Sequence, residues 1–242
     1  MTTELASRFA AVEHRIAEAC AAAGRPRGAV RLLAASKTRT PEAIAALHAL
    51  GQPLFGENRA QEIRDKVDPV HDLARGRGAA APEWHFIGHL QKNKVKYVVG
   101  RASMVHSVDS LELAQALSAR VVRSRDGGQS LADLQVLIEV NVSGEASKSG
   151  VRPEAALDLV GAAGALEGLV VKGLMTMPPM DADPAEARPH FDALAELAAA
   201  GRSGGLELPE LSMGMSRDFE HAIAAGSTLI RIGTDLFGPR GR

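Results

Sequence analysis

The stretch Val30-Arg-Leu-Leu-Ala-Ala-Ser-Lys37-Thr38 is a short apolar run that ends at a cation. A near-continuous apolar run of this length is typical of a parallel strand covered on both faces. Thr40-Pro41-Glu42 follows closely and is a helix-start signal. In sheets built from such strand–helix units, ligands bind at the carboxyl ends of the strands. We therefore expect Lys37 to lie at the edge of the sheet where a ligand would bind.

A lysine in this place has two interpretations. A partly desolvated amine can lose its proton near neutral pH and attack a carbonyl to form a Schiff base. Alternatively, the side chain simply extends to solvent from the end of the strand. The position of Lys37 alone favours the second interpretation. The choice between the two therefore depends on the other residues of the chain.

Short apolar runs alternate with longer amphipathic ones along the chain. A first helix is expected from about Leu5 to Ala23, before the first strand. The expected strands are 30–36, 53–56, 84–88, 104–108, 134–142, 169–176, 208–213 and 228–232, and the expected helices between them are 41–50, 58–74, 90–99, 110–124, 153–165, 185–200 and 217–225.

About eight strand–helix units predict an α/β fold, a single (β/α)8 barrel of the TIM type with an extra N-terminal helix. We expect one domain over residues 1–242. A doubly wound open sheet has a similar pattern and is the alternative. Little chain follows the last strand, so the N-terminal helix is expected to cover the place of an eighth barrel helix.

Composition argues against several classes of protein. The 242 residues carry 28 Lys and Arg against 29 Asp and Glu, a net charge of -1, which predicts no general attraction to nucleic acid or to an anionic membrane. We find no signal-peptide pattern and no apolar stretch near the ~20 residues of a membrane span. The single cysteine, Cys20, excludes an internal disulfide and reads as a packed residue of the first helix. We expect a soluble, cytoplasmic protein that is a monomer.

Polar residues and glycines gather after the expected strands, where a barrel would bring them together. Ser212-Met-Gly-Met-Ser216 leads into a helix, and Gly233-Thr234 follows the neighbouring last strand. Phosphate sites in barrels frequently use these two loops, because backbone N–H groups and helix amino ends attract anions. Each piece alone could be an ordinary cap or turn. Together with Lys37, they suggest a phosphorylated carbonyl ligand.

Arg231 lies inside the apolar run Leu229-Ile-Arg-Ile232. A guanidinium within a strand must be paired or must face a ligand. The structural interpretation is an ion pair with a carboxylate such as Glu57 or Asp235. The functional interpretation is a hydrogen bond to a heteroaromatic nitrogen, since arginine is one of the known partners of the pyridoxal phosphate ring.

The other candidate functional residues are supported more weakly by the sequence. Lys148 is the rival Schiff-base lysine, but its loop is polar. Lys92, Lys94 and Lys96 read as a solvated helix face, and the metal-ligand spacing of a zinc site is absent from the sequence around His85, His89 and His106. No metal is predicted.

Seven segments together carry a resemblance to a known family. They are A-A-S-K-T (34–38), G-E-N-R-A-Q-E (56–62), W-H-F-I-G-H-L-Q-K-N-K (84–94), S-K-S-G (147–150), K-G-L-M-T-M (172–177), L-S-M-G-M-S (211–216) and A-A-G-S-T-L-I-R-I-G-T-D-L-F-G (224–238). In these segments, which span nearly the whole chain in order, the sequence resembles the pyridoxal-phosphate homeostasis proteins, also described as alanine-racemase N-terminal-domain-like proteins.

The resemblance implies a (β/α)8 barrel that holds pyridoxal 5'-phosphate (PLP) as a Schiff base on Lys37. It implies that the phosphate is bound by Ser216, Gly233 and Thr234, that Arg231 faces the pyridine nitrogen, and that Asn58 lines the ring pocket. Arg217 departs from the family pattern, in which an acid often follows the serine, and adds positive charge near the phosphate.

The resemblance also implies a carrier or buffer of PLP, with PLP-requiring apoenzymes as partners, rather than an enzyme. Racemases of the related type use a tyrosine from an additional carboxy-terminal domain as a second base, whereas the only tyrosine here, Tyr97, falls in an expected helix. Two alternatives stay open: a PLP-dependent, racemase-like enzyme acting on amino acids, and a Schiff-base aldolase acting on sugar phosphates.

Overall fold

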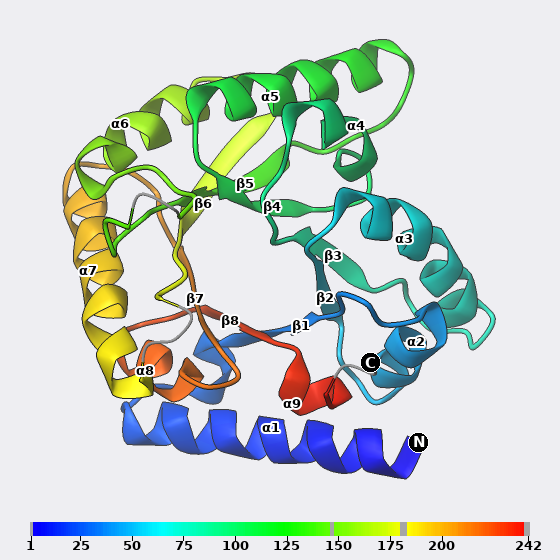
Figure 1. Ribbon diagram of the computed structural model, residues 1–242. Helices are drawn as coiled ribbons and strands as arrows, with labels where there is room; N and C mark the ends of the chain where they lie inside the picture. Colours follow the sequence, from blue (N-terminus) through cyan, green and yellow to red (C-terminus); the bar gives the residue numbers. More distant parts are fainter. Residues whose placement is uncertain (1, 146–147, 180–182, 240–242) are drawn as a thin grey trace.

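The described residues of the computed structural model, 2–145, 148–179 and 183–239, form a closed barrel. Its parallel strands follow one another in chain order from β1 to β8. The barrel closes where β1 pairs with β8, with Arg31 opposite Leu229 and Ala34 opposite Ile232. Helices surround the strands (Figure 1). The predicted (β/α)8 barrel is confirmed, and the open sheet is excluded because β1 and β8 are hydrogen-bonded neighbours.

The elements lie close to the predicted ranges. The strands are β1 (Arg31–Ala35), β2 (Leu54–Glu57), β3 (Glu83–Phe86), β4 (Met104–Val108), β5 (Leu134–Glu139), β6 (Leu169–Met175), β7 (Glu210–Met215) and β8 (Leu229–Ile232). The α-helices are α1 (Thr2–Ala22), α2 (Pro41–Ala49), α3 (Ala60–Arg75), α4 (Val95–Val98), α5 (Leu111–Asp126), α6 (Pro153–Gly164), α7 (Pro184–Ser203), α8 (Phe219–Ala224) and α9 (Thr234–Phe237). Two 3-10 turns are η1 (Arg27–Ala29) and η2 (Lys92–Lys94).

Three expected elements differ from the structure. β7 begins at Glu210 rather than at residue 208, because Pro209 has no N–H for the ladder. β5 ends at Glu139 rather than at residue 142, since Val140 makes only an isolated bridge, to Val151. The helix expected at 90–99 is reduced to η2 and α4, because the backbone is extended at both Gln91 and Val99.

The alternation of side chains along each strand divides the apolar core. Leu32 and Ala34 of β1 belong to the large cluster between the strands and the helices. Leu33, between them in sequence, packs inside the barrel against Leu54 and Leu229. Successive side chains of a strand point to opposite faces, so residues two apart share the barrel interior. This rule also places polar side chains inside the barrel, among them His85, His106 and Ser212.

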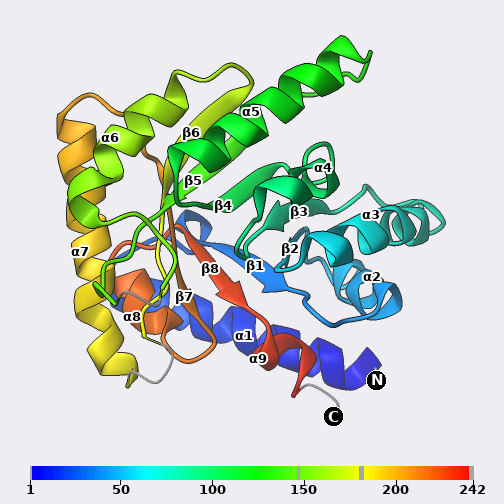
Figure 2. The same ribbon diagram turned by 45° about the horizontal axis from the view of Figure 1, so that its top comes forward.

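The N-terminal helix packs against the barrel beside the end of the last strand. After β8 the described residues form the short helix α9, which was not predicted. α1 runs alongside α8 and α9 in both views (Figures 1 and 2), as expected. Cys20 of α1 is buried, also as expected. None of the described helices combines the length and apolar character that a membrane crossing requires.

Candidate functional site

A cavity of about 640 Å³ lies at the carboxyl ends of the barrel strands. Its volume is in the range of small-molecule sites, roughly 300–1,000 Å³. The sequence-predicted residues all contribute to its wall: Lys37, Asn58, Ser216, Arg231, Gly233 and Thr234. Closure of the barrel therefore brings together residues that are far apart in the sequence.

Lys37 lies in the turn between β1 and α2, and helix α3 holds that turn in place. The next residue, Thr38, has a φ of 65°, a left-handed conformation that is unfavourable for a β-branched residue. The backbone N–H of Thr38 donates to Glu62 Oε2 at 2.7 Å. This hydrogen bond offsets part of the strain and fixes the direction in which the chain carries Lys37.

A buried lysine of α3 completes this support. Lys66 Nζ donates to Glu57 Oε1 at 2.8 Å, to Glu62 Oε2 at 2.6 Å and to the carbonyl of Ser36 at 3.0 Å. Burial raises the pKa of Glu57, although Lys66 opposes the shift. Glu57 is thus committed to Lys66 and Ser36, so the proposed ion pair between Glu57 and Arg231 is wrong.

Arg231 is buried in the cavity wall and is held by neutral groups. Its Nη1 donates to Ser212 Oγ, and its Nη2 donates to the carbonyl of Thr176 at 3.0 Å. The other suggested partner, Asp235, pairs with Arg15 instead. Burial lowers the pKa of Arg231 to about 10. The guanidinium therefore keeps its charge at neutral pH while its hydrogen-bonded partners in the described residues are uncharged.

Two acids in the same wall were missed by the sequence analysis. Glu139, at the end of β5, is only 3% exposed, and burial together with the charge of Asp109 raises its pKa to about 7. Burial also raises the pKa of Asp218, whose Oδ1 accepts the Met215 N–H at 2.6 Å. The signal that identified Arg231, a charge inside an apolar strand, is equally present at Glu139 in Leu137-Ile-Glu-Val140.

The loops after β7 and β8 bring Ser216, Gly233 and Thr234 to the cavity. Gly233 directly precedes α9, and a Cβ at this position would lie 3.1 Å from the carbonyl oxygen of Ala35. The absence of a side chain there lets the β8 loop pack closely on β1. The two loops therefore present backbone and hydroxyl groups on the side of the cavity next to Lys37.

The extra helix α1 ties these two loops together. Arg15 Nη1 donates to Asp235 Oδ2 at 2.7 Å, next to Thr234, and Nη2 donates to Glu220 Oε1 at 2.7 Å, in the helix after Ser216. The same Nη2 lies 3.5 Å from the Ser216 carbonyl. The sequence analysis expected α1 to cover the barrel but did not foresee this link.

Asn58 lines the cavity. Its Oδ1 is buried and has no hydrogen-bond partner among the described residues. A Cβ at Gly88 would lie 2.1 Å from the Asn58 backbone oxygen, so only glycine lets the segment after β3 pack this closely. A buried acceptor without a partner is costly to stability, and a donor that reached Asn58 Oδ1 would remove this cost.

The rival lysine lies in the same cavity wall. Lys148 Nζ is 3.1 Å from Glu145 Oε1, an ion pair without hydrogen-bond geometry, and Ser147 beside it lies outside the described residues. Lys92 and Lys96 are exposed, and Tyr97 lies in α4, not among the described residues that line the cavity. Across the described ranges, no three His, Cys, Asp or Glu residues are arranged to hold a metal ion.

Comparisons with known proteins find relatives over nearly the whole chain. The model of the family "Alanine racemase, N-terminal domain" matches residues 8–241. A pyridoxal phosphate homeostasis protein of Aquifex aeolicus (strain VF5) is 44% identical over 234 residues, which cover 96% of this chain and 97% of the relative.

Two solved structures share the fold over nearly the whole chain. One is of an unknown protein from Bifidobacterium adolescentis, with a TM-score of 0.90 and 37% identity, covering 97% of this chain and 95% of the other. The second is of PipY from Synechococcus elongatus PCC7942 with PLP bound, with a TM-score of 0.80 and 31% identity, covering 97% and 100%.

Proposed function

This chain belongs to the pyridoxal phosphate homeostasis proteins, within the alanine racemase N-terminal domain family, and we propose that it binds PLP in the barrel cavity and carries or buffers it. The resemblance drawn from the sequence motifs is thereby confirmed. One observation carries the proposal: a single cavity combines an amine at the end of β1, a buried guanidinium on β8 and the Ser216 and Gly233-Thr234 loops. Bound PLP supplies an aldehyde that reacts with amines and a ring that withdraws electrons.

Lys37 is the residue proposed to form the Schiff base. It lies in a turn whose Thr38 N–H donates to Glu62, and Glu62 is itself hydrogen-bonded to Lys66, so the backbone of Lys37 is fixed before any ligand enters. Preorganisation of this kind lowers the cost of binding, because little conformational freedom remains to be lost. Lys148 is the alternative amine, and its partner Glu145 sits on the same loop.

The remaining predicted residues suit the other parts of the cofactor. Arg231 is a buried donor that suits the pyridine nitrogen, and Asn58 Oδ1 is a buried acceptor in need of a donor. Ser216, Gly233 and Thr234 suit the phosphate, since hydroxyl and backbone N–H groups bind anions at such loops in barrels. Arg217 lines the same cavity and adds a positive charge.

We propose that the protein's main role is to hold PLP and release it to PLP-requiring apoenzymes, with little catalysis of its own. The described wall of the cavity contains no tyrosine to serve as a second base. We expect it to act as a cytoplasmic monomer, with the whole chain as one cofactor-binding domain.

A racemase-like activity is the second candidate, and Glu139 is the observation that favours it. A buried carboxyl whose pKa is about 7 can accept and return a proton near neutral pH. Deuterium exchange at Cα of amino acids measures this activity directly. Exchange that Glu139→Gln abolishes would establish the enzyme, whereas no exchange with any amino acid would leave the carrier.

A transfer assay tests the carrier. The protein is loaded with PLP, freed of excess cofactor by gel filtration, and mixed with the apo form of a PLP-dependent aminotransferase. We expect the aminotransferase to regain activity in proportion to the loaded protein, and Lys37→Ala to deliver much less. Loaded protein that retains all its PLP in the presence of excess apoenzyme would contradict a carrier role.

A further inference from the structure

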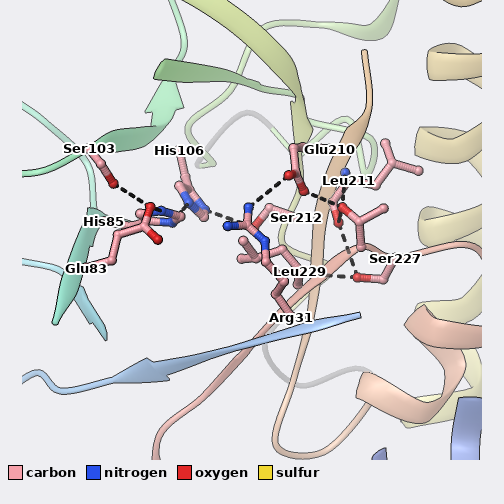
Figure 3. A network of polar contacts seen from close by, with 11 residues as sticks. Arg31, Glu83, His85, Ser103, His106, Glu210, Leu211, Ser212, Ser227 and Leu229 are labelled. Atoms are coloured by element: carbon pink, nitrogen blue, oxygen red, sulfur yellow. Dashed lines mark hydrogen bonds and ion pairs between the residues drawn. The ribbon is translucent and has the colours of Figure 1, made fainter. Parts of the chain in front are cut away.

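A chain of hydrogen-bonded side chains crosses the inside of the barrel beneath Arg231. Ser212 Oγ accepts from Arg231 and lies 2.9 Å from His106 Nδ1. His106 Nε2 lies 2.9 Å from His85 Nδ1, and His85 Nε2 lies 2.9 Å from Glu83 Oε1. Figure 3 shows Glu83, His85 and His106 between Ser103 and Ser212. We call Ser212, His106, His85 and Glu83 the relay.

The relay connects the cavity with the opposite end of the barrel. Ser212, His106 and His85 are 0% exposed, whereas the side chain of Glu83, at the first residue of β3, is 45% exposed. Its members come from β7, β4 and β3, so the contacts run across the barrel interior rather than along one strand. Ser103 also donates to Glu83 Oε1 at 2.7 Å.

Glu83, at one end of the relay, fixes the direction of every hydrogen bond in it while both imidazoles are neutral. A carboxylate only accepts, so Glu83 requires a proton on His85 Nε2. Neutral His85 then accepts at Nδ1, which requires a proton on His106 Nε2. His106 in turn accepts at Nδ1, so Ser212 donates its hydroxyl proton to it. A guanidinium only donates, and the lone pairs of Ser212 remain for Arg231.

Both imidazoles must be neutral for this arrangement, and their surroundings favour that state. Burial lowers the pKa of His106 well below its usual value, and the charges of Arg231 and Arg31 act in the same direction. Burial also lowers the pKa of His85, although Glu83 opposes the shift. Every polar atom of the two rings has a partner, as a buried polar network requires.

We propose that Ser212, oriented by His106 and His85, is a positioning residue that keeps the guanidinium of Arg231 directed at the ring of the bound cofactor. This inference rests on the proposed function and goes beyond it. Glu139 and Asp218 line the same cavity, and their charges act on Arg231, yet neither forms an ion pair with it in the described part of the chain. Without Ser212 as acceptor, these carboxylates would draw Arg231 away from the ring position.

The relay is tested first in the PLP-free protein, by ¹⁵N NMR of the imidazole nitrogens. We expect both His85 and His106 to carry their proton on Nε2 at neutral pH. A proton on Nδ1 of either ring, or a doubly protonated ring, would overturn the proposal. Because this measurement needs no cofactor, its failure is distinguishable from failure of the proposed function.

The second test compares variants of two buried serines by PLP titration. Ser212→Ala is expected to weaken binding about tenfold, since Arg231 then occupies the ring position for only a fraction of the time. It should also shift the ¹⁵N signal of ring-labelled PLP. The control is Ser227→Ala, which loses hydrogen bonds to the Leu211 and Met213 carbonyls but does not touch the relay. Equal effects of both variants, or no effect of Ser212→Ala, would overturn the proposal.

A surface variant covers the case in which Ser212→Ala does not fold. Glu83 is half exposed, so Glu83→Ala should be tolerated. With the fixed acceptor removed, we expect mixed imidazole tautomers in the NMR spectrum of the PLP-free protein. Unchanged single tautomers would contradict the claim that Glu83 sets the direction of the relay.

Discussion

Arg15 Nη1, in the helix that precedes the barrel, lies 2.7 Å from Asp235 Oδ2, one residue past the Gly233-Thr234 pair proposed to bind phosphate. The same guanidinium reaches Glu220, in the helix that follows Ser216. An element outside the repeating barrel therefore holds the two loops on which the proposed phosphate site depends.

Replacement of Arg15 should weaken PLP binding. In Arg15→Ala, the carboxylates of Asp235 and Glu220 lose the cation that joins them, so the two loops proposed to bind the phosphate lose their link. We expect PLP affinity to fall about three- to tenfold by fluorescence titration. Arg8→Ala is the matched control, because Arg8 of the same helix pairs only with Glu4 among the described charges. Equal affinities for the two variants would contradict this role.

Lys66 should be important for stability. Lys66→Met leaves Glu57, whose side chain is 0% exposed, without its cation, and an unpaired buried charge costs about 3–5 kcal/mol. Chemical denaturation measures this loss. The double variant Lys66→Met/Glu57→Gln should recover part of it, since the carboxylate is then gone. If Lys66→Met were as stable as the parent, Lys66 would not support the turn that carries Lys37.

Glu139 should make stability depend on pH. Its pKa is raised from 4.5 to about 7, so the folded state binds a proton that the unfolded state has already lost. The contribution of Glu139 therefore falls as pH rises from about 4.5 to 7, and the penalty is complete above that range. At pH 8, Glu139→Gln should be more stable than the parent by up to about 3 kcal/mol, and at pH 4 the difference should vanish. Chemical unfolding of the parent and of Glu139→Gln at both pH values measures this difference. The same difference in stability at pH 4 and pH 8 would contradict the raised pKa.

Gly88 should be needed for the position of Asn58. The added methyl of Gly88→Ala would meet the Asn58 carbonyl, which is backbone and cannot swing aside. We expect both lower stability and weaker PLP binding, measured by thermal unfolding and titration. Gly161→Ala, in α6, is the control, because nothing lies within 4 Å of its new Cβ. It should leave binding unchanged and gain up to about 1 kcal/mol. Normal PLP affinity in Gly88→Ala would remove Asn58 from the site.

The sequence was sufficient for the barrel and for the location of the site. Apolar runs of strand length, separated by amphipathic segments, set the number and order of the elements, and parallel strands bring their carboxyl ends to one edge. For that reason Lys37, Ser216 and Gly233-Thr234 could be expected at one edge of the barrel, whereas Asn58 was expected in the pocket only from the family resemblance.

Contacts across the barrel could not be predicted in the same way. Alternation along a strand shows that His85 faces the interior, but not that it meets His106 of β4, because register and strand tilt decide which interior side chains touch. The predicted carboxylate partner of Arg231 was wrong for this reason: its observed partners are Ser212 on β7 and Thr176 directly after β6, and neither is a carboxylate. The raised pKa of Glu139 likewise depends on burial that only the assembled wall provides.

The most direct test of the central claim is borohydride reduction of the PLP-loaded protein, followed by peptide mapping. We expect a visible absorbance band that borohydride removes and a single phosphopyridoxyl group on Lys37, with no band in Lys37→Ala. Modification of Lys148 in the parent protein, or no band after addition of PLP, would contradict it, and the second result would favour an aldolase that acts on sugar phosphates.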